Sequence, residues 1–166
     1  GAGGNLRDWT FDGLLERLTD TYTVTAFDRP GLGYTDRVPG IPTGAFATIG
    51  DSPQAQARML REAAGKLGIT DPIVAGHSFG GAVAIAWAVA GLDEDAPHNA
   101  RAITSFAGVA MPWPGDLGRY YTINGSALGG AFVIPLISSV ASDSQIEMAI
   151  DGVFAPQPAP AGYTQH

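Results

Sequence analysis

Residues 72–90 read PIVAGHSFGGAVAIAWAVA, and this stretch decides the fold. It opens with a short apolar run, Pro72–Gly76, that is typical of a buried strand. Phe79–Ala90 follows as an almost wholly apolar segment of helical length, which predicts a helix buried on several sides. Because only His77 and Ser78 separate the two, the chain must change from strand to helix within one turn.

The turn itself, residues 76–80, has the pattern G-x-S-x-G. A strand-to-helix turn this sharp holds Ser78 in a strained conformation, and a side chain at Gly76 or Gly80 is expected to collide with neighbouring backbone. Ser78 then stands at the carboxyl edge of the sheet, where the N–H groups and dipole of the helix N-terminus favour an oxyanion. The pattern alone is weak, but its place between strand and helix predicts a nucleophilic serine rather than a plain glycine-rich turn.

Alternating strand and helix patterns continue on both sides of this turn. Residues 22–27 and 101–106 are rich in strand formers. Helices are predicted over residues 8–18 and 53–68, the second with Ser52 as its N-cap. This succession predicts an α/β fold in which a parallel sheet is wrapped by helices.

After Gly108 the alternation stops. The segment MPWPG at residues 111–115 is followed by two helical stretches, and Ser142 with Gln145 predicts a capping box at the start of the second. We therefore expect two parts, residues 1–110 as a partial α/β core and residues 111–166 as a helical lid that roofs an apolar pocket. The apolar lid residues are Trp113, Tyr120, Tyr121, Phe132, Val133, Ile134 and Phe154.

Composition excludes several classes of function. The 166 residues are 45% hydrophobic and 15% charged, which fits a folded domain, and the net charge of −7 argues against nucleic acid and anionic membranes as partners. With no cysteine and three histidines that lack ligand spacing, neither a metal nor another cofactor is expected. The longest apolar run, residues 129–140, is broken by Pro135 and is too short to span a membrane.

The chain begins GAGG without an initiator methionine, so we interpret it as a piece of a longer protein, truncated at both ends. It shows no basic leader at its start. The targeting signal of the longer parent cannot be read from this piece, and a soluble protein is expected, with the cytoplasm favoured.

Three motifs in this order, GAGGN at residues 1–5, FDRPGLGYTD at 27–36 and GHSFGG at 76–81, resemble the α/β-hydrolase superfamily. The resemblance is to its cap-bearing, serine-nucleophile branch of esterase-, haloperoxidase- and C–C-hydrolase-like members. It implies that Ser78 is the catalytic nucleophile. It also implies that the backbone N–H groups of Ala2 and Phe79 form the oxyanion hole, with Gly3 as the alternative to Ala2.

Asp28 and Arg29 lie in the second of these motifs and are candidates for an acid and a substrate clamp. We favour a structural role for both, because an aspartate after a strand commonly caps a tight turn.

The histidine base and the acid that a serine nucleophile needs are harder to place. His77 adjoins Ser78 but points to the opposite face of its strand, so we expect it to pack under the turn. His98 precedes the strand at 101–106 and therefore lies at the amino edge, roughly 20 Å away. His166 closes the chain. Asp116 is the candidate acid, although in the superfamily the acid usually comes later.

The sequence therefore predicts a serine hydrolase that forms an acyl-enzyme at Ser78 with a small apolar ester or related carbonyl substrate. The histidine and acid are expected outside this chain, so this piece alone is expected to be nearly inactive. Two alternatives stay open: C–C bond hydrolysis or perhydrolysis on the same scaffold, and a hydrolase-like binding module without turnover.

Overall fold

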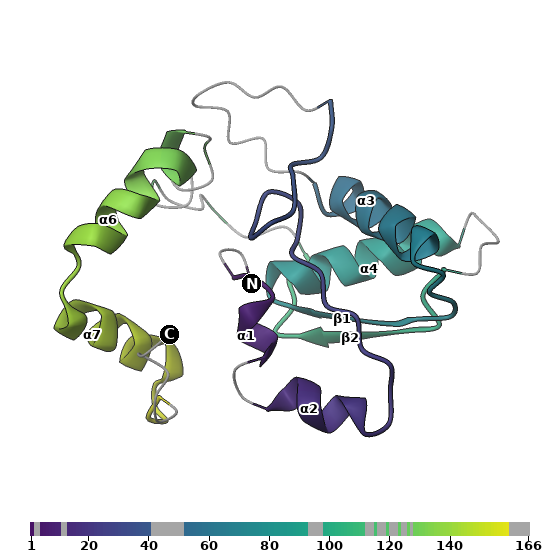
Figure 1. Ribbon diagram of the computed structural model, residues 1–166, viewed down its shortest axis with the longest axis horizontal. Coiled ribbons are helices and arrows are strands. Elements are labelled where there is room, and N and C mark those ends of the chain that lie inside the picture. The colour runs from purple at the N-terminus through teal and green to yellow at the C-terminus, as the bar shows by residue number, and fades with distance from the viewer. Residues whose placement is uncertain are drawn as a thin grey trace. The chain divides into compact units, whose positions relative to one another are not determined.

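The computed structural model describes residues 1, 4–10, 13–40, 52–92, 98–111, 115, 119, 123, 126 and 128–159. Its elements in chain order are α1 (Arg7–Thr10), α2 (Leu14–Thr19), α3 (Pro53–Lys66), β1 (Ile73–His77), α4 (Phe79–Gly91), β2 (Ala102–Phe106), η1 (Gly129–Val133), α6 (Ile134–Val140) and α7 (Asp143–Phe154) (Figure 1). The described residues up to Gly115 form one compact unit, and those from Arg119 onward form another.

The first unit is built on β1 and β2, which pair in parallel with Ile73 opposite Ala102 and His77 opposite Phe106. The chain crosses from β1 to β2 through α4, as a parallel pair requires. Helix α4 packs on both strands, and α3 packs on α4, so the two helices lie on the same side of the strands (Figure 1). This arrangement confirms the predicted α/β class, a parallel sheet with helices packed on it.

The core of this unit lies between α3 and α4. Ala57 and Ala64 on α3 are completely buried, and their small side chains let the two helices approach closely. Trp87 on α4 is buried too, and its indole N–H donates to the carbonyl of His98 at 3.0 Å. The buried apolar residues are Ala57, Leu60, Ala64, Val83, Ala84, Ala86 and Trp87. Because apolar burial is the main stabilising term in folding, this interface fixes α3 against α4, the helix that begins directly after Ser78.

Helix α3 begins where the sequence predicts and ends at Lys66, two residues before the predicted end. The hydroxyl of Ser52 accepts from the N–H of Ala55 at 3.1 Å, and Pro53 occupies the first helical position. An N-cap of this kind contributes about 1 kcal/mol. At the other end Gly68 takes a φ of +69°, which glycine adopts without steric cost, and the chain turns away toward β1.

The helix predicted over residues 8–18 is wrong as a continuous element, because the structure shows α1 and α2 instead. Gly13 takes a left-handed φ of +70° immediately before α2, which no α-helix can contain. The described apolar residues of this segment therefore belong to two separate helices.

The strand predicted over residues 22–27 is also wrong. Within the described part of the chain the sheet has two strands, β1 and β2, and residues 23–29 belong to neither. A strand requires a hydrogen-bonded neighbour as well as β-forming residues, and this segment has none in the described sheet. Its apolar end does face inward, because Phe27 packs against the core cluster.

The strand bounds shift by one residue. Pro72 has no N–H to give to a ladder, so β1 begins at Ile73 and reaches His77. Arg101 likewise lies outside β2, although its N–H donates to the carbonyl of Pro72 at 2.9 Å.

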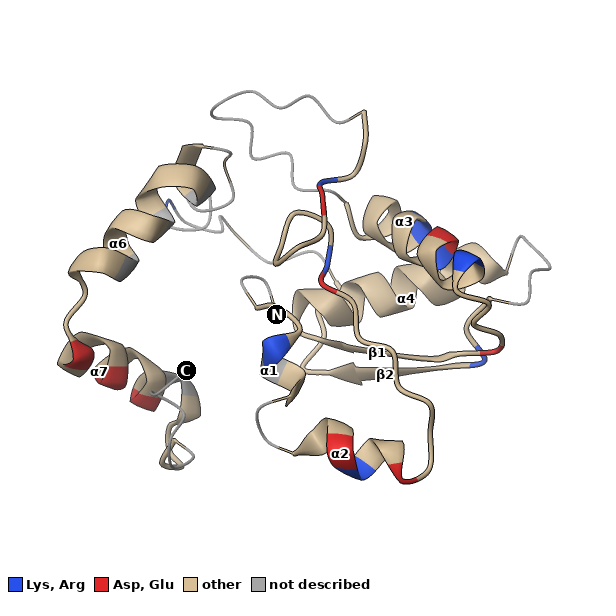
Figure 2. Ribbon diagram, viewed as in Figure 1, with Lys and Arg blue, Asp and Glu red and all other residues tan. Residues whose placement is uncertain are grey.

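The second unit consists of η1, which runs directly into α6, and α7 after a short connection. The capping box predicted at the start of α7 forms, with the Ser142 N–H donating to the side-chain oxygen of Gln145 at 3.0 Å. Asp143, Glu147 and Asp151 give α7 an acidic side (Figure 2).

Candidate active site at the serine turn

Ser78 lies between the last residue of β1 and the first residue of α4, with φ 52° and ψ −121°. A positive φ is uncommon for a residue with a side chain, and conformations of this kind cost roughly 1–3 kcal/mol. Its N–H donates to the carbonyl of Phe106 at 2.9 Å, and its carbonyl accepts from the N–H of Gly81 at 2.9 Å. The end of β2 and the first turn of α4 therefore hold the strained backbone from both sides.

The hydroxyl of Ser78 does not cap α4. The first N–H groups of a helix have no intrahelical acceptor, so a negatively charged oxygen near Ser78 would meet donors and the positive end of the helix dipole. The resemblance assigns one of these donors, the N–H of Phe79, to the oxyanion hole. The assignments of Ser78 and Phe79 as catalytic groups remain predictions.

Glycines beneath the turn allow backbone to contact backbone. A Cβ atom at Gly76 would lie 2.1 Å from the carbonyl oxygen of Gly80, far inside van der Waals contact. A Cβ atom at Gly81 would lie 2.5 Å from the hydroxyl of Ser105 and 2.7 Å from the Cα of Gly108. The strand and the helix thus approach each other at a spacing that only hydrogen side chains permit.

The collision expected at Gly80 is not present. A Cβ atom there would contact only the Cδ of Arg29 among the described residues outside its own turn, at an ordinary 3.9 Å. The prediction for Gly80 is therefore wrong, because its Cα–Cβ direction points away from the neighbouring backbone, whereas the one at Gly76 points into it.

His77 is exposed, so the expectation that it packs under the turn is wrong. Its position at the end of β1 places it on the face opposite to Gly76. A Cβ atom at Gly1 would lie 3.5 Å from Nδ1 of His77, so the N-terminal residue lies beside this ring.

Asp28 has the structural role that we favoured. It is buried, and its carboxylate accepts from the N–H of Leu6 at 2.7 Å and from the N–H of Tyr34 at 3.2 Å. The turn that follows brings Gly33 so close that a Cβ atom there would overlap the carboxylate. Asp28 therefore connects two segments through its carboxylate, which is the structural role.

Several predicted site residues lie outside the described residues: Ala2, Gly3, Asp116 and His166. The same is true of three predicted lid aromatics, Trp113, Tyr120 and Tyr121. Their roles stay predictions.

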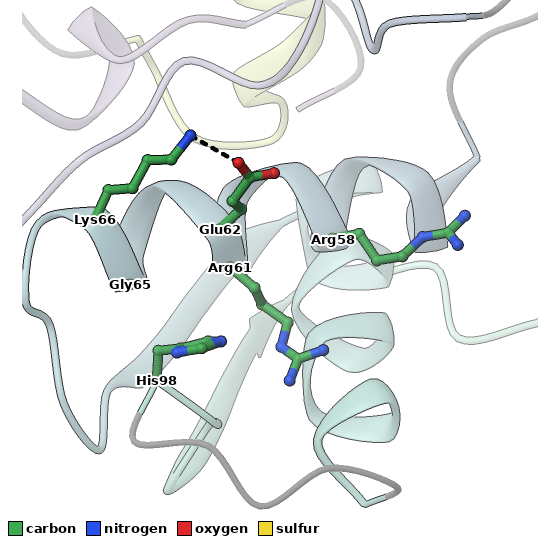
Figure 3. Close-up of a pocket in the computed structure, with 6 residues that line it drawn as sticks. All are labelled: Arg58, Arg61, Glu62, Gly65, Lys66 and His98. Atoms are coloured by element: carbon green, nitrogen blue, oxygen red, sulfur yellow. Dashed lines mark ion pairs between the residues drawn. The ribbon is translucent and has the colours of Figure 1, made fainter.

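His98 lies at the other end of the strands, shortly before β2 begins. It lines a groove of about 470 Å³ with Arg58, Arg61, Glu62, Gly65 and Lys66 of α3. Figure 3 shows Arg61 and His98 facing each other, while Lys66 reaches to Glu62 at 2.6 Å. The hydrogen bond from Lys66 lowers the pKa of the Glu62 carboxyl. Because β1 and β2 are parallel, His98 is at the amino end and Ser78 at the carboxyl end, so His98 is not positioned to be the base.

Sequence reasoning missed Gln56, which is buried on α3 and binds Arg29. A signal was present: Gln56, Leu60 and Ala64 follow at intervals of four, so a polar residue stands within the buried stripe of the helix. Polar groups at such positions are hydrogen-bonded and often link elements.

Residues 1–164 match the Alpha/beta hydrolase family. The chain belongs to the α/β-hydrolase family. It is also 38% identical over 99 residues to the dihydrolipoyllysine-residue acetyltransferase component of the acetoin cleaving system of Cupriavidus necator. That match covers 60% of this α/β-hydrolase chain and 22% of the relative, so the chain spans under a quarter of the relative's length. No solved structure matches.

Two further features of this α/β-hydrolase chain concern the described residues alone. None of the described helices has the length and apolar character needed to cross a membrane. No group of three acidic or histidine side chains gathers there as a metal site.

Proposed function

We propose that this chain carries the nucleophile of a serine hydrolase that acts on an ester or related carbonyl substrate. The observation that carries the proposal is the conformation of Ser78, a strained serine at a strand-to-helix turn with backbone packed against backbone beneath it. Strain of this kind persists only where the surrounding structure enforces it, and it is concentrated at functional sites. Membership in the α/β-hydrolase family supports the reading, because this fold presents a nucleophile at such a turn.

In the proposed reaction the Ser78 hydroxyl gives its proton to a histidine and its oxygen bonds to the substrate carbonyl carbon. The carbonyl π electrons move to the oxygen, which the N–H groups of Phe79 and Ala2 stabilise. Collapse of this intermediate expels the alcohol, which takes the proton from the histidine, and water then hydrolyses the acyl-enzyme by the same steps. We place the histidine and the acid outside this chain, since His77 and His98 are both unsuitably positioned.

We further propose that the second unit is the lid of the substrate pocket. Its support is the apolar character of side chains such as Phe132, which is 67% exposed, and Phe154. An apolar lid would exclude water from the acyl-enzyme and favour substrates with apolar acyl or alcohol groups.

A second candidate, acyl transfer to an acceptor other than water, is favoured by the relative that is named as an acetyltransferase. Both candidates use the same acyl-enzyme at Ser78, and they differ only in the molecule that removes the acyl group.

The test is active-site labelling and burst kinetics on the full-length protein. A fluorophosphonate should label the wild type and the Ser139→Ala control, which alters an exposed serine of α6, but not Ser78→Ala. A p-nitrophenyl ester should give a burst of one equivalent followed by turnover. If an added thiol or alcohol captures the acyl group in place of water, transfer is the activity. If the folded protein shows no labelling and no burst, the proposal is refuted and a binding module is favoured.

A further inference from the structure

Arg29 connects three parts of the first unit that are far apart in sequence. One terminal nitrogen, Nη1, donates to the side-chain oxygen of Gln56 on α3 at 3.0 Å. The other, Nη2, donates to the carbonyl of Gly1. The guanidinium carbon lies 4.9 Å from the ring centroid of Phe79, the first residue of α4. One side chain thus contacts the N-terminal loop, α3 and the residue that follows Ser78.

The charge and the planar shape of the guanidinium fix the geometry of these contacts. Burial lowers the pKa of the Arg29 guanidinium from its ordinary value, but an arginine in a protein keeps its charge. Hydrogen bonds from a cation are stronger than neutral ones, and a cation over an aromatic face adds about 0.5–2 kcal/mol. The planar fork fixes the direction of each N–H, so the acceptors on Gln56 and Gly1 are held at set positions relative to the Phe79 ring.

The neighbours of Arg29 anchor it further. Asp28, the preceding residue, is held by its bonds to Leu6 and Tyr34. The Arg29 stem passes next to Gly80, where its Cδ would lie 3.9 Å from a Cβ atom, an ordinary contact distance. The second glycine of the G-x-S-x-G pattern therefore adjoins Arg29, where a collision with backbone had been expected.

Resting on the proposed function, we propose that Arg29 is a positioning residue that fixes the start of α4, and with it the oxyanion donor assigned to Phe79. Its guanidinium packs on the Phe79 ring, while its two terminal nitrogens donate to the carbonyl of Gly1 and the side chain of Gln56. The N-terminal residue and α3 therefore set the place of the guanidinium against the first residue of α4.

Two simpler roles predict different results. If Arg29 only stabilises the fold, its replacement lowers stability and leaves the acylation rate of the folded enzyme unchanged. If its charge alone stabilises the oxyanion, Arg29→Lys retains most of the rate. The positioning role requires the planar guanidinium with its two terminal nitrogens, because an ammonium group cannot hold the Gly1 and Gln56 acceptors at their mutual spacing.

The experiment measures the fluorophosphonate labelling rate and the kcat and KM for a p-nitrophenyl ester, using the full-length protein. Arg29→Lys and Arg29→Met should both lose roughly ten- to a hundredfold in labelling rate and kcat with KM nearly unchanged, as expected for a misplaced transition-state donor. Methylguanidinium ions should restore part of the rate to Arg29→Ala, and ammonium ions should not. Arg37→Met, which removes an exposed guanidinium from the same loop, is the matched control and should behave as wild type.

Gln56→Met serves as a second variant should the Arg29 variants fail to fold. It removes the acceptor that Gln56 offers to Nη1 and leaves the guanidinium in place, and we expect a smaller loss of rate, about three- to tenfold. Wild-type rates in folded Arg29→Met or Gln56→Met would overturn the inference, as would full activity of Arg29→Lys or an equal loss in Arg37→Met. A wild type that is never labelled overturns the proposed function itself, so the two failures are distinguishable.

Discussion

The two ends of β1 and β2 are assembled in different ways. At the carboxyl end, Gly76 and Gly81 bring backbone against backbone, and no methyl group fits between them. At the amino end, side chains make the connections. Buried Arg61 donates to Asn99 at 2.6 Å, and Asn99 donates to the carbonyl of Gly91 at 3.2 Å, beside an open groove. The carboxyl end therefore excludes even a single Cβ atom at these two glycines, whereas the amino end is joined by hydrogen-bonding side chains.

The largest effect should come from Gly76→Ala. Its Cβ would lie 2.1 Å from the Gly80 carbonyl oxygen. Because the Cβ is rigidly attached to the backbone of β1 and the oxygen belongs to the backbone of α4, the strand and the helix would have to separate. We expect a loss of at least about 3 kcal/mol in the free energy of unfolding. Thermal and urea unfolding of the purified variants would measure it.

Gly80→Ala is the matched control within the same motif. Its Cβ meets Arg29 Cδ at 3.9 Å, and alanine is favoured over glycine in a helix, so we expect no loss and up to about 1 kcal/mol of gain. Equal destabilisation by the two substitutions would contradict the claim that Gly76, and not Gly80, faces the neighbouring backbone.

An intermediate effect is expected at the nucleophile itself. The φ of 52° at Ser78 is strained for any residue with a Cβ and relaxed for glycine. Ser78→Gly should therefore be more stable than Ser78→Ala by about 1 kcal/mol, while both variants lose labelling by the fluorophosphonate. Comparing the two variants cancels the loss of the hydroxyl and isolates the strain. Equal unfolding midpoints would show that the turn is not strained.

The features that were predictable from sequence are those set by neighbouring residues. The apolar runs on either side of Ser78, the Ser52 cap of α3 and the capping box at Ser142 each depend on side chains within a few positions of one another. The same local logic predicted that a side chain at Gly76 would collide with backbone, and that Asp28 would hold a turn.

The features that were missed depend on partners distant in sequence. Residues 22–27 have strand-forming side chains, but pairing is decided by what lies beside them. The break at Gly13 appears only as a backbone angle, since glycine within a helical pattern permits either outcome. The contacts of Arg29 with Gly1, Gln56 and Phe79 span up to 50 positions of chain, and no local pattern records them.

The smallest effect, and the one that probes the amino end directly, is expected for Gly65→Ala on α3. Its Cβ would lie 3.3 Å from Nδ1 of His98, a contact with a side chain rather than with backbone. The ring borders a groove of about 470 Å³ and can move by the few tenths of an ångström required. The gain in helix propensity, up to about 1 kcal/mol, should offset that adjustment, so the free energy of unfolding should change by less than about 0.5 kcal/mol. A loss as large as that of Gly76→Ala would mean that the amino end is as tightly specified as the serine turn. The contrast between the two ends would then fail, and close packing around Ser78 would no longer be a mark of function.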